Sequence, residues 1–215
     1  MIRTGRYLQS VRSALAEGVR TQLDLALSGD ALAARRLMIV APRRLRGHIA
    51  NLAYHLRTRN PAYREIMKGV WADDTRHLLT AHWPQQTVRR MLARADFPPP
   101  ELSGPVTIYR AVVKGTAKKG AAGLCWRLSR EEAAAEALLA DPARARILTS
   151  TIDPGDIIYS GGRRSGQEVV PRRPVETFLV EPVSLPRLPS TDVTSSVDSG
   201  RRRSHAPRGR AAQRA

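Results

Sequence analysis

The stretch Phe97-Pro98-Pro99-Pro100 divides this 215-residue sequence into two halves of different character. Three successive prolines cannot continue a helix, because each lacks a backbone N–H, and they favour a stiff, extended spacer. Before this stretch, apolar residues recur at steps of three and four. After it, β-branched residues gather in short runs. The stretch therefore predicts a boundary between a helical region and a sheet region.

Residues 7–96 have the apolar spacing of amphipathic helices. The first apolar stripe covers residues 7–27, and a short helix is expected over residues 31–40. Each break between helices is marked by a residue that ends one helix or starts the next: Gly29-Asp30, Pro42, Asn60-Pro61 and Trp83-Pro84. The stripes predict a helical layer packed around Trp71.

Residues 105–185 change to short, β-branched runs, of which Val106–Val113 is the clearest. Ser129 and Glu132 have the spacing of a capping box and predict the start of a helix that continues to Leu139. Further short strands are expected over residues 124–128, 147–152, 157–159, 168–170 and 177–180. A basic loop between the first two strands is expected to be bounded by Gly115, Gly120 and Gly123. Several short strands with one interposed helix indicate a small α+β domain.

Positive charge is concentrated towards the two ends of the chain, which carries a net charge of +17. Residues 1–97 hold 17 Lys and Arg against 7 Asp and Glu, residues 98–185 hold 12 against 10, and residues 186–215 hold 7 against 2. Such an excess belongs either to a solvated, Arg-rich surface or to a surface that faces nucleic acid. No zinc-finger spacing, aromatic RNA-binding signature or leucine heptad accompanies it.

Composition and pattern together predict four segments. They are a helical domain over residues 1–97, a proline-rich linker over residues 98–104, an α+β domain over residues 105–185 and a disordered basic tail over residues 186–215. The last segment has no apolar periodicity. It cannot bury enough surface to offset the entropy lost on ordering, so we expect it to stay unfolded.

Composition also excludes several classes of protein. The single cysteine, Cys125, excludes an intrachain disulfide framework and a Cys-rich zinc site. No apolar run approaches the roughly 18 residues that span a bilayer, and no signal-peptide segment is present. No two histidines have the spacing of a His-Glu-x-x-His zinc site, so His48, His55, His77 and His82 are interpreted as surface or core-edge residues. We expect a soluble, cytoplasmic protein without a metal or a membrane partner.

Three short motifs of the second half carry the candidate chemistry: Ile108-Tyr109-Arg110-Ala111, Leu124-Cys125-Trp126-Arg127 and Ser165-Gly166-Gln167-Glu168. Taken singly, each has an ordinary explanation, because a strand Arg is usually solvated, a strand Trp usually fills the core and a Glu usually lies at the surface. A lone cysteine on an apolar strand is usually an inert small hydrophobe. A cysteine nucleophile would need a neighbouring base, and His205 is the only histidine outside the helical half.

In this order the three motifs resemble the Arg–Ser–Glu class of the ADP-ribosyltransferase superfamily, over residues 105–182. That family places an Arg on its first core strand, a Ser-containing element on a second strand followed by a helix, and a catalytic Glu at the start of a later strand. The resemblance implies an NAD-dependent ADP-ribosyltransferase or NAD glycohydrolase of toxin or phage type. NAD would be its substrate, and its acceptor would be an unknown protein or nucleic acid.

The resemblance also implies a role for each matching residue. Glu168 is the catalytic residue, whose carboxylate stabilises the oxocarbenium-like transition state from the ribose 2′-OH side. Arg110 clamps the pyrophosphate through a forked, charge-assisted contact. Cys125 lies beside the nicotinamide ribose, and Trp126 either walls the nicotinamide pocket or fills the core. These roles require Arg110, Cys125 and Glu168 to line one cleft.

The sequence departs from the family pattern where Cys125 replaces a Ser, Arg127 replaces a Thr, and Gly166 replaces the first Glu or Gln of the third motif. A thiol is a weaker hydrogen-bond donor than a hydroxyl, and the position of Gly166 normally helps to engage the acceptor. Three functions therefore stay open. They are an enzyme that cleaves NAD with or without a macromolecular acceptor, a nucleic-acid-binding protein that uses its basic helical half and tail, and a structural or interaction protein with an inactive transferase-like fold.

Overall fold

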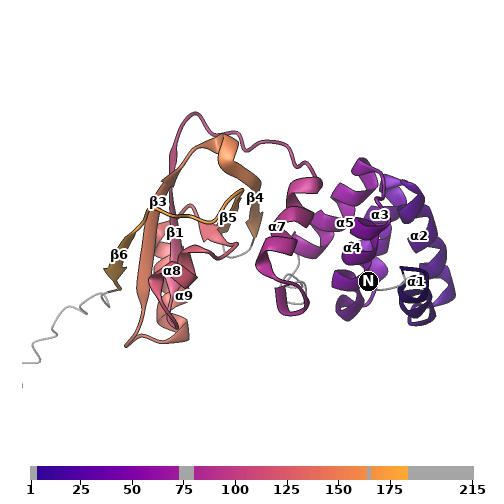
Figure 1. Ribbon diagram of the computed structural model, residues 1–215, viewed down its shortest axis with the longest axis horizontal. Coiled ribbons are helices and arrows are strands. Elements are labelled where there is room, and N and C mark those ends of the chain that lie inside the picture. Colours follow the sequence, from indigo (N-terminus) through magenta and orange to yellow (C-terminus); the bar gives the residue numbers. More distant parts are fainter. Residues whose placement is uncertain (1–3, 73–79, 164–165, 184–215) are drawn as a thin grey trace, which may run out of the picture. The chain divides into compact units, whose positions relative to one another are not determined.

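The computed structural model describes residues 4–72, 80–163 and 166–183. The chain from Met1 to Leu185 forms one compact unit, in which helices come first and a sheet follows (Figure 1). The α+β class predicted from the sequence is therefore confirmed. The predicted tail over residues 186–215 lies outside the described residues.

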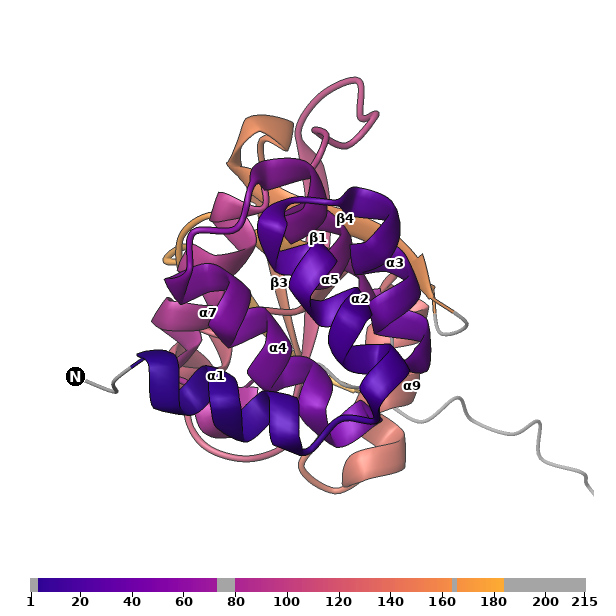
Figure 2. The ribbon, with the colours of Figure 1, turned by 90° about the vertical axis from the view of Figure 1, so that its right-hand side faces the viewer.

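Helices make up the described amino-terminal half: α1 (Thr4–Ser13), α2 (Glu17–Ser28), α3 (Ala31–Val40), α4 (Arg43–His55), α5 (Asn60–Ala72) and α7 (Gln85–Arg94). The apolar stripe over residues 7–27 is shared by two helices, because the chain is extended at Ala16, between α1 and α2. This break turns α1 against α4, where the Tyr7 hydroxyl and Nδ1 of His48 are hydrogen-bonded at 2.8 Å. Figure 2 shows these helices from the side of the molecule that lies on the right in Figure 1.

The predicted helix boundaries are confirmed because they depend on local chemistry. Gly29 ends α2 with a φ of 115°, a left-handed conformation that glycine adopts without strain. The Asp30 carboxylate accepts a hydrogen bond of 2.9 Å from the backbone N–H of Ala33 and so caps α3. Helices α4 and α7 begin directly after Pro42 and Pro84.

The carboxyl-terminal half is built on one six-stranded antiparallel sheet in the order β4-β5-β2-β1-β3-β6. Its strands are β1 (Val106–Val112), β2 (Trp126–Arg127), β3 (Arg146–Ile152), β4 (Ile157–Arg163), β5 (Gly166–Pro171) and β6 (Leu179–Pro182). The second strand is shorter than the expected residues 124–128. As a result, few ladder pairs hold it between its neighbours.

Two helices and one 3₁₀ turn, η1 (Pro154–Asp156), connect the strands. Helix α9 (Arg130–Ala140) begins as predicted, with the Ser129 hydroxyl accepting a hydrogen bond of 3.2 Å from the N–H of Glu132. The predicted basic loop between Gly115 and Gly123 instead contains the short helix α8 (Ala117–Ala121). Thr116 caps this helix by accepting a bond of 3.2 Å from the N–H of Lys119. The sequence prediction missed α8 because this short, Lys- and Gly-containing segment has no apolar periodicity.

Two apolar clusters stabilise the fold. The larger contains the interior of the helical half, including the fully buried Trp71, and also Ile158, Tyr159 and Val170 from the sheet. The smaller lies within the sheet half and contains Ile108, Val112, Ala121, Trp126, Leu148, Ile157 and Val169. The predicted packing around Trp71 is confirmed, and its cluster extends beyond the helices onto strands β4 and β5.

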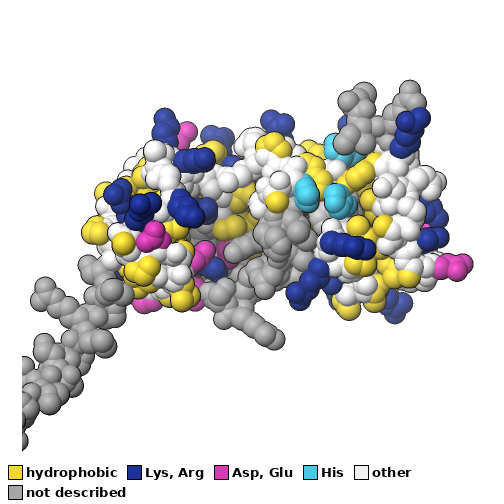
Figure 3. All heavy atoms as spheres, turned by 90° about the horizontal axis from the view of Figure 1, so that it is seen from below, with side chains coloured by type: hydrophobic (Ala, Val, Ile, Leu, Met, Phe, Trp, Pro, Cys, Tyr) yellow, Lys and Arg dark blue, Asp and Glu magenta, His cyan; other side chains and the backbone are white. Residues whose placement is uncertain are grey.

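The basic excess of the helical half is displayed at its surface. Arg35 and Arg36 in the middle of α3 and Arg43 and Arg44 at the start of α4 are all exposed. Of these, Arg35 forms an ion pair of 2.9 Å with Glu65 of α5. Figure 3 shows one face of the molecule, on which Lys and Arg side chains are spread over both halves and acidic side chains are sparse.

A buried arginine joins the helical half to the sheet half. Arg89 of α7 is 4% exposed, and its guanidinium donates to the carbonyl oxygens of Pro171 at 3.1 Å and Ala122 at 3.2 Å. Burial, together with the positive charge of Arg110, lowers the pKa of this guanidinium from its usual value. Arg89 therefore ties α7 to β5 and to the segment that precedes β2.

We expect Arg89→Ala to lower the free energy of unfolding by about 2–4 kcal/mol, because it removes charge-assisted hydrogen bonds and leaves buried carbonyls unsatisfied. The matched control is Arg90→Ala, which changes the exposed neighbour on the same helix and should cost less than about 0.5 kcal/mol. Urea unfolding of the two variants measures the difference. Equal costs would show that Arg89 does not join the two halves.

Candidate functional site

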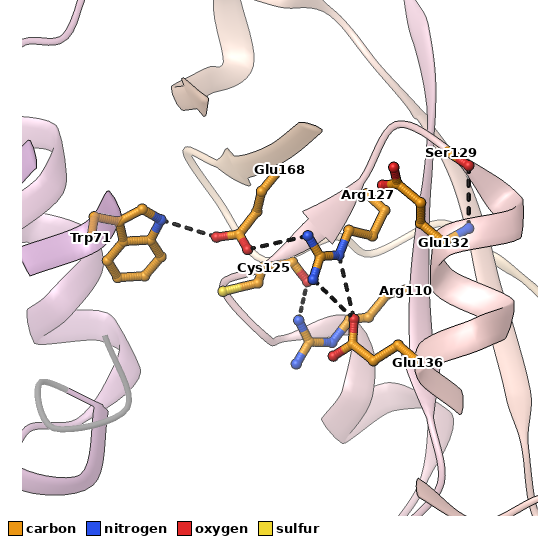
Figure 4. Close-up of polar contacts among 8 residues, drawn as sticks. All are labelled: Trp71, Arg110, Cys125, Arg127, Ser129, Glu132, Glu136 and Glu168. Atoms are coloured by element: carbon orange, nitrogen blue, oxygen red, sulfur yellow. Dashed lines mark hydrogen bonds and ion pairs between the residues drawn. The ribbon is translucent and has the colours of Figure 1, made fainter. Parts of the chain in front are cut away.

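Glu168 lies on β5 with a side chain only 1% exposed, in contact with both halves of the chain. The indole N–H of Trp71, from helix α5, donates a hydrogen bond of 3.0 Å to Oε1 of this carboxylate (Figure 4). A guanidinium nitrogen of Arg127 lies 3.8 Å from Oε2. A buried carboxylate is costly unless it is paired and hydrogen-bonded, and these two residues supply both kinds of contact.

Arg127 connects Glu168 to the helix that follows β2. It pairs with Glu168 across β2 and β5, so the two side chains project from the same face of the sheet. Through Nε and Nη2 it also donates two bonds of 3.3 Å to Oε2 of Glu136 on α9. Because Glu136 is more than half exposed, Arg127 links a buried carboxylate to one at the surface.

Arg110 projects from the other face of the sheet. Its neighbour Tyr109 pairs with Arg127, whereas Arg110 pairs with Leu148. Successive side chains alternate between faces, so Arg110 and Glu168 start on opposite sides. The strand register therefore does not support the expectation that Arg110 and Glu168 share a cleft.

The Arg110 guanidinium lies against the chain just before β2. It donates a hydrogen bond to the backbone carbonyl of Cys125, and it lies where a Cβ at Gly123 would be. Only glycine leaves room for the guanidinium at position 123. In this structure Arg110 therefore holds the entry to the short strand β2.

The two remaining predicted residues follow the same strand. Trp126 is fully buried, and it pairs with Val169 in the smaller apolar cluster. Of the two interpretations of Trp126, the structure favours the one in which it fills the core. Cys125 is half-buried and packs against the edge of the larger cluster.

A cavity of about 780 Å³ lies beside Glu168 on the side of the linker. Gly161, which pairs with Glu168, lines it together with Tyr159 of β4. The remaining wall comes from residues 97–102 and from Arg64, Glu65 and Lys68 of α5, and Gln167 completes it. The cavity thus opens next to the strand that carries the buried carboxylate.

Aromatic rings separate the cavity from Glu168. The ring of Tyr159 lies 5.0 Å from that of Phe97 and 6.3 Å from that of Trp71, centroid to centroid, both in edge contacts. Trp71 in turn holds Glu168. Tyr159 therefore lines the cavity, whereas Glu168 is buried behind it and is not among the lining residues.

Trp71, Arg127 and Glu136 were not predicted as parts of this site. Trp71 belongs to the apolar stripe of a helix, and nothing in that stripe indicates a partner 97 residues further along the chain. A local signal did exist for Arg127 and Glu136, because a strand that leads directly into a capped helix places the two residues close together.

The described histidines lie at the surface or at the edge of the core, as predicted, and His77 lies outside the described residues. His48 is half-buried, with the exposed His82 at 5.3 Å between ring centroids. Burial, and secondarily His82, lowers the pKa of His48. Within residues 4–72, 80–163 and 166–183, no group of three or more His, Cys, Asp or Glu could hold a metal ion, and no helix is long and apolar enough to cross a membrane.

Comparison with family models, with curated proteins and with solved structures yields no match for this chain. The interpretation of the site therefore depends on its own geometry and on the motifs that the sequence carries.

The hydrogen bond from Trp71 to Glu168 predicts different costs for two tryptophan substitutions. Trp71→Phe removes the donor to a buried carboxylate, and Trp126→Phe removes an equally buried indole whose N–H has no hydrogen-bond partner among the described residues. We expect Trp71→Phe to lower the free energy of unfolding by about 1.5–3 kcal/mol more than Trp126→Phe does. Chemical denaturation of both variants measures this difference, and equal costs would show that the bond contributes nothing to stability.

Proposed function

We propose that this chain is an NAD-cleaving enzyme of the ADP-ribosyltransferase type, with Glu168 as its catalytic carboxylate. One observation carries the proposal: the strand order β5-β2-β1 sets the three motifs on adjacent strands, with Glu168 of the third motif beside Arg127 of the second. The middle strand leads directly into a capped helix, as the resemblance implies. The acid of the third motif is then paired with a residue of the second.

Cleavage of the nicotinamide–ribose bond of NAD requires a carboxylate that is held in a fixed position. Nicotinamide leaves NAD with the electron pair of the C–N glycosidic bond, and its ring loses its positive charge as it departs. Positive charge develops on the ribose, and a carboxylate aimed at the 2′-OH stabilises it. Water or an acceptor group then bonds to C1′ and releases a proton. Arg127 and Trp71 would restrict the motion of Glu168 during these steps.

The cavity beside Glu168 is the proposed entry for NAD. Tyr159 and Phe97 line it with aromatic rings, and Lys68 and Arg64 bring positive charge for the phosphates, next to the acids Glu65 and Glu101. Arg110 lies on the other face, so the proposal does not assign the pyrophosphate to it. Because Glu168 is 1% exposed under Trp71, we expect slow turnover unless α5 shifts away from the sheet.

We expect Glu168→Gln to reduce nicotinamide release from NAD by about 10²–10³-fold, because a neutral amide stabilises developing positive charge poorly. The control is Glu176→Gln, which makes the same chemical change at an exposed position and should leave the rate within about twofold. Release is measured by chromatography, and thermal melts check that both variants fold. If the parent protein releases no nicotinamide, or if Glu168→Gln matches it, the proposal is wrong.

One observation favours a second function, which is the binding of nucleic acid. Two pairs of arginines are exposed on neighbouring helices, Arg35 and Arg36 in the middle of α3 and Arg43 and Arg44 in the first turn of α4, and Glu65 is the acidic partner of Arg35. Clustered arginines bind phosphate backbones without regard to sequence. Such a surface would bring a modifying enzyme to a nucleic-acid target, so the two functions are compatible.

For duplex DNA, we expect affinity to fall linearly with salt on a double-logarithmic plot, because phosphate contacts release counterions. Changing Arg43 and Arg44 together to Ala should reduce the slope of that plot by about 2. The control changes the exposed Lys118 and Lys119 of the sheet half to Ala and should leave the slope unchanged. Fluorescence anisotropy at several salt concentrations measures it, and equal slopes in all three proteins would exclude this surface as the binding site.

A further inference from the structure

A second cavity, of about 560 Å³, lies on the face of the sheet opposite Glu168. Strand pairing places its floor there: Arg146 of β3 pairs with Val112 of β1 and with Pro182 of β6, and Leu148 pairs with Val180. Val112 and Leu148 belong to the smaller apolar cluster, so the cavity lies on the face of the sheet that this cluster covers. The floor is therefore a strip of aliphatic side chains from three adjacent strands.

The rim of this cavity is basic and contains no acid. Lys114, Arg144 and Arg146 line it, all three exposed, and no Asp or Glu is among its lining residues. The cavity beside Glu168, in contrast, is lined by the carboxylates of Glu65 and Glu101. The two cavities therefore differ in charge, and they have no lining residue in common.

We propose that this cavity binds a small phosphorylated molecule with an apolar ring, of the nucleoside monophosphate class. A phosphate monoester carries close to two negative charges, whereas a carboxylate carries one. The two guanidinium groups and one ammonium group of the rim therefore match a phosphate better than a carboxylate. The aliphatic floor receives the ring and removes its surface from water. The volume lies within the range of small-molecule sites. This inference does not depend on NAD cleavage at Glu168.

The test uses AMP as the probe, with adenosine and inorganic phosphate as partial probes, in titration calorimetry on the full chain. We expect AMP to bind at least tenfold more tightly than either part, because ring and phosphate contacts add. The double variant that carries both Arg144→Ala and Arg146→Ala should bind AMP about tenfold more weakly, or more weakly still. The matched control is Arg172→Ala with Arg173→Ala, two exposed arginines outside this cavity, and it should stay within twofold of the parent.

Three outcomes would overturn the proposal: AMP does not bind, phosphate alone binds as well as AMP, or both double variants lose affinity equally. The single variant Lys114→Ala, which keeps both arginines, should cause a smaller loss than the double variant. Glu168→Gln should leave AMP binding unchanged. A loss in that variant would instead place the nucleotide at Glu168, so the result separates this site from the proposed NAD site.

Discussion

The contact on which the two halves of the molecule converge is the buried carboxylate of Glu168. The indole of Trp71 reaches it from the helical half, and Arg127 reaches it from the neighbouring strand. A carboxylate at this depth needs charged and hydrogen-bonding partners to offset the cost of its burial, and these two residues are among those that supply them. The position of α5 on the sheet, the register of β2 against β5 and the state of the candidate site are thereby coupled.

Arg127 stands where the resembling family has a threonine, and the structure gives this difference a physical role. A threonine at this position could donate one hydrogen bond, whereas the guanidinium contacts Glu168 and Glu136 together. The replacement extends the site from the sheet to α9. It also adds a positive charge beside the acid that the proposed chemistry uses, so that Glu168 is contacted by Arg127 from the sheet half as well as by Trp71 from the helical half.

Features set by local chemistry were predictable from the sequence, and those set by pairing between distant strands were not. The glycine that ends α2, the caps at Asp30 and Ser129 and the helix starts after Pro42 and Pro84 each depend on a few adjacent residues. The faces of Arg110 and Glu168 depend instead on the register of β2 between β1 and β5. A shift of one residue in that register would move a side chain to the other face, and nothing in the motifs themselves fixes it. Trp71 was correctly placed in the core, but its bond to Glu168 required the complete fold.

The brevity of β2 has a mechanical consequence. Among the described strands, this two-residue strand alone pairs with both β5 of the β4-β5 pair and β1 of the trio β1-β3-β6. It meets β1 at a single pair and β5 at two, so the centre of the sheet is its weakest seam. The side chains of Arg110 and Arg89 both bind backbone carbonyls of the segment that leads into β2, and Arg89 also binds the carbonyl of Pro171 in β5. Because so few ladder pairs cross this point, the sheet depends here on arginine side chains as much as on strand pairing.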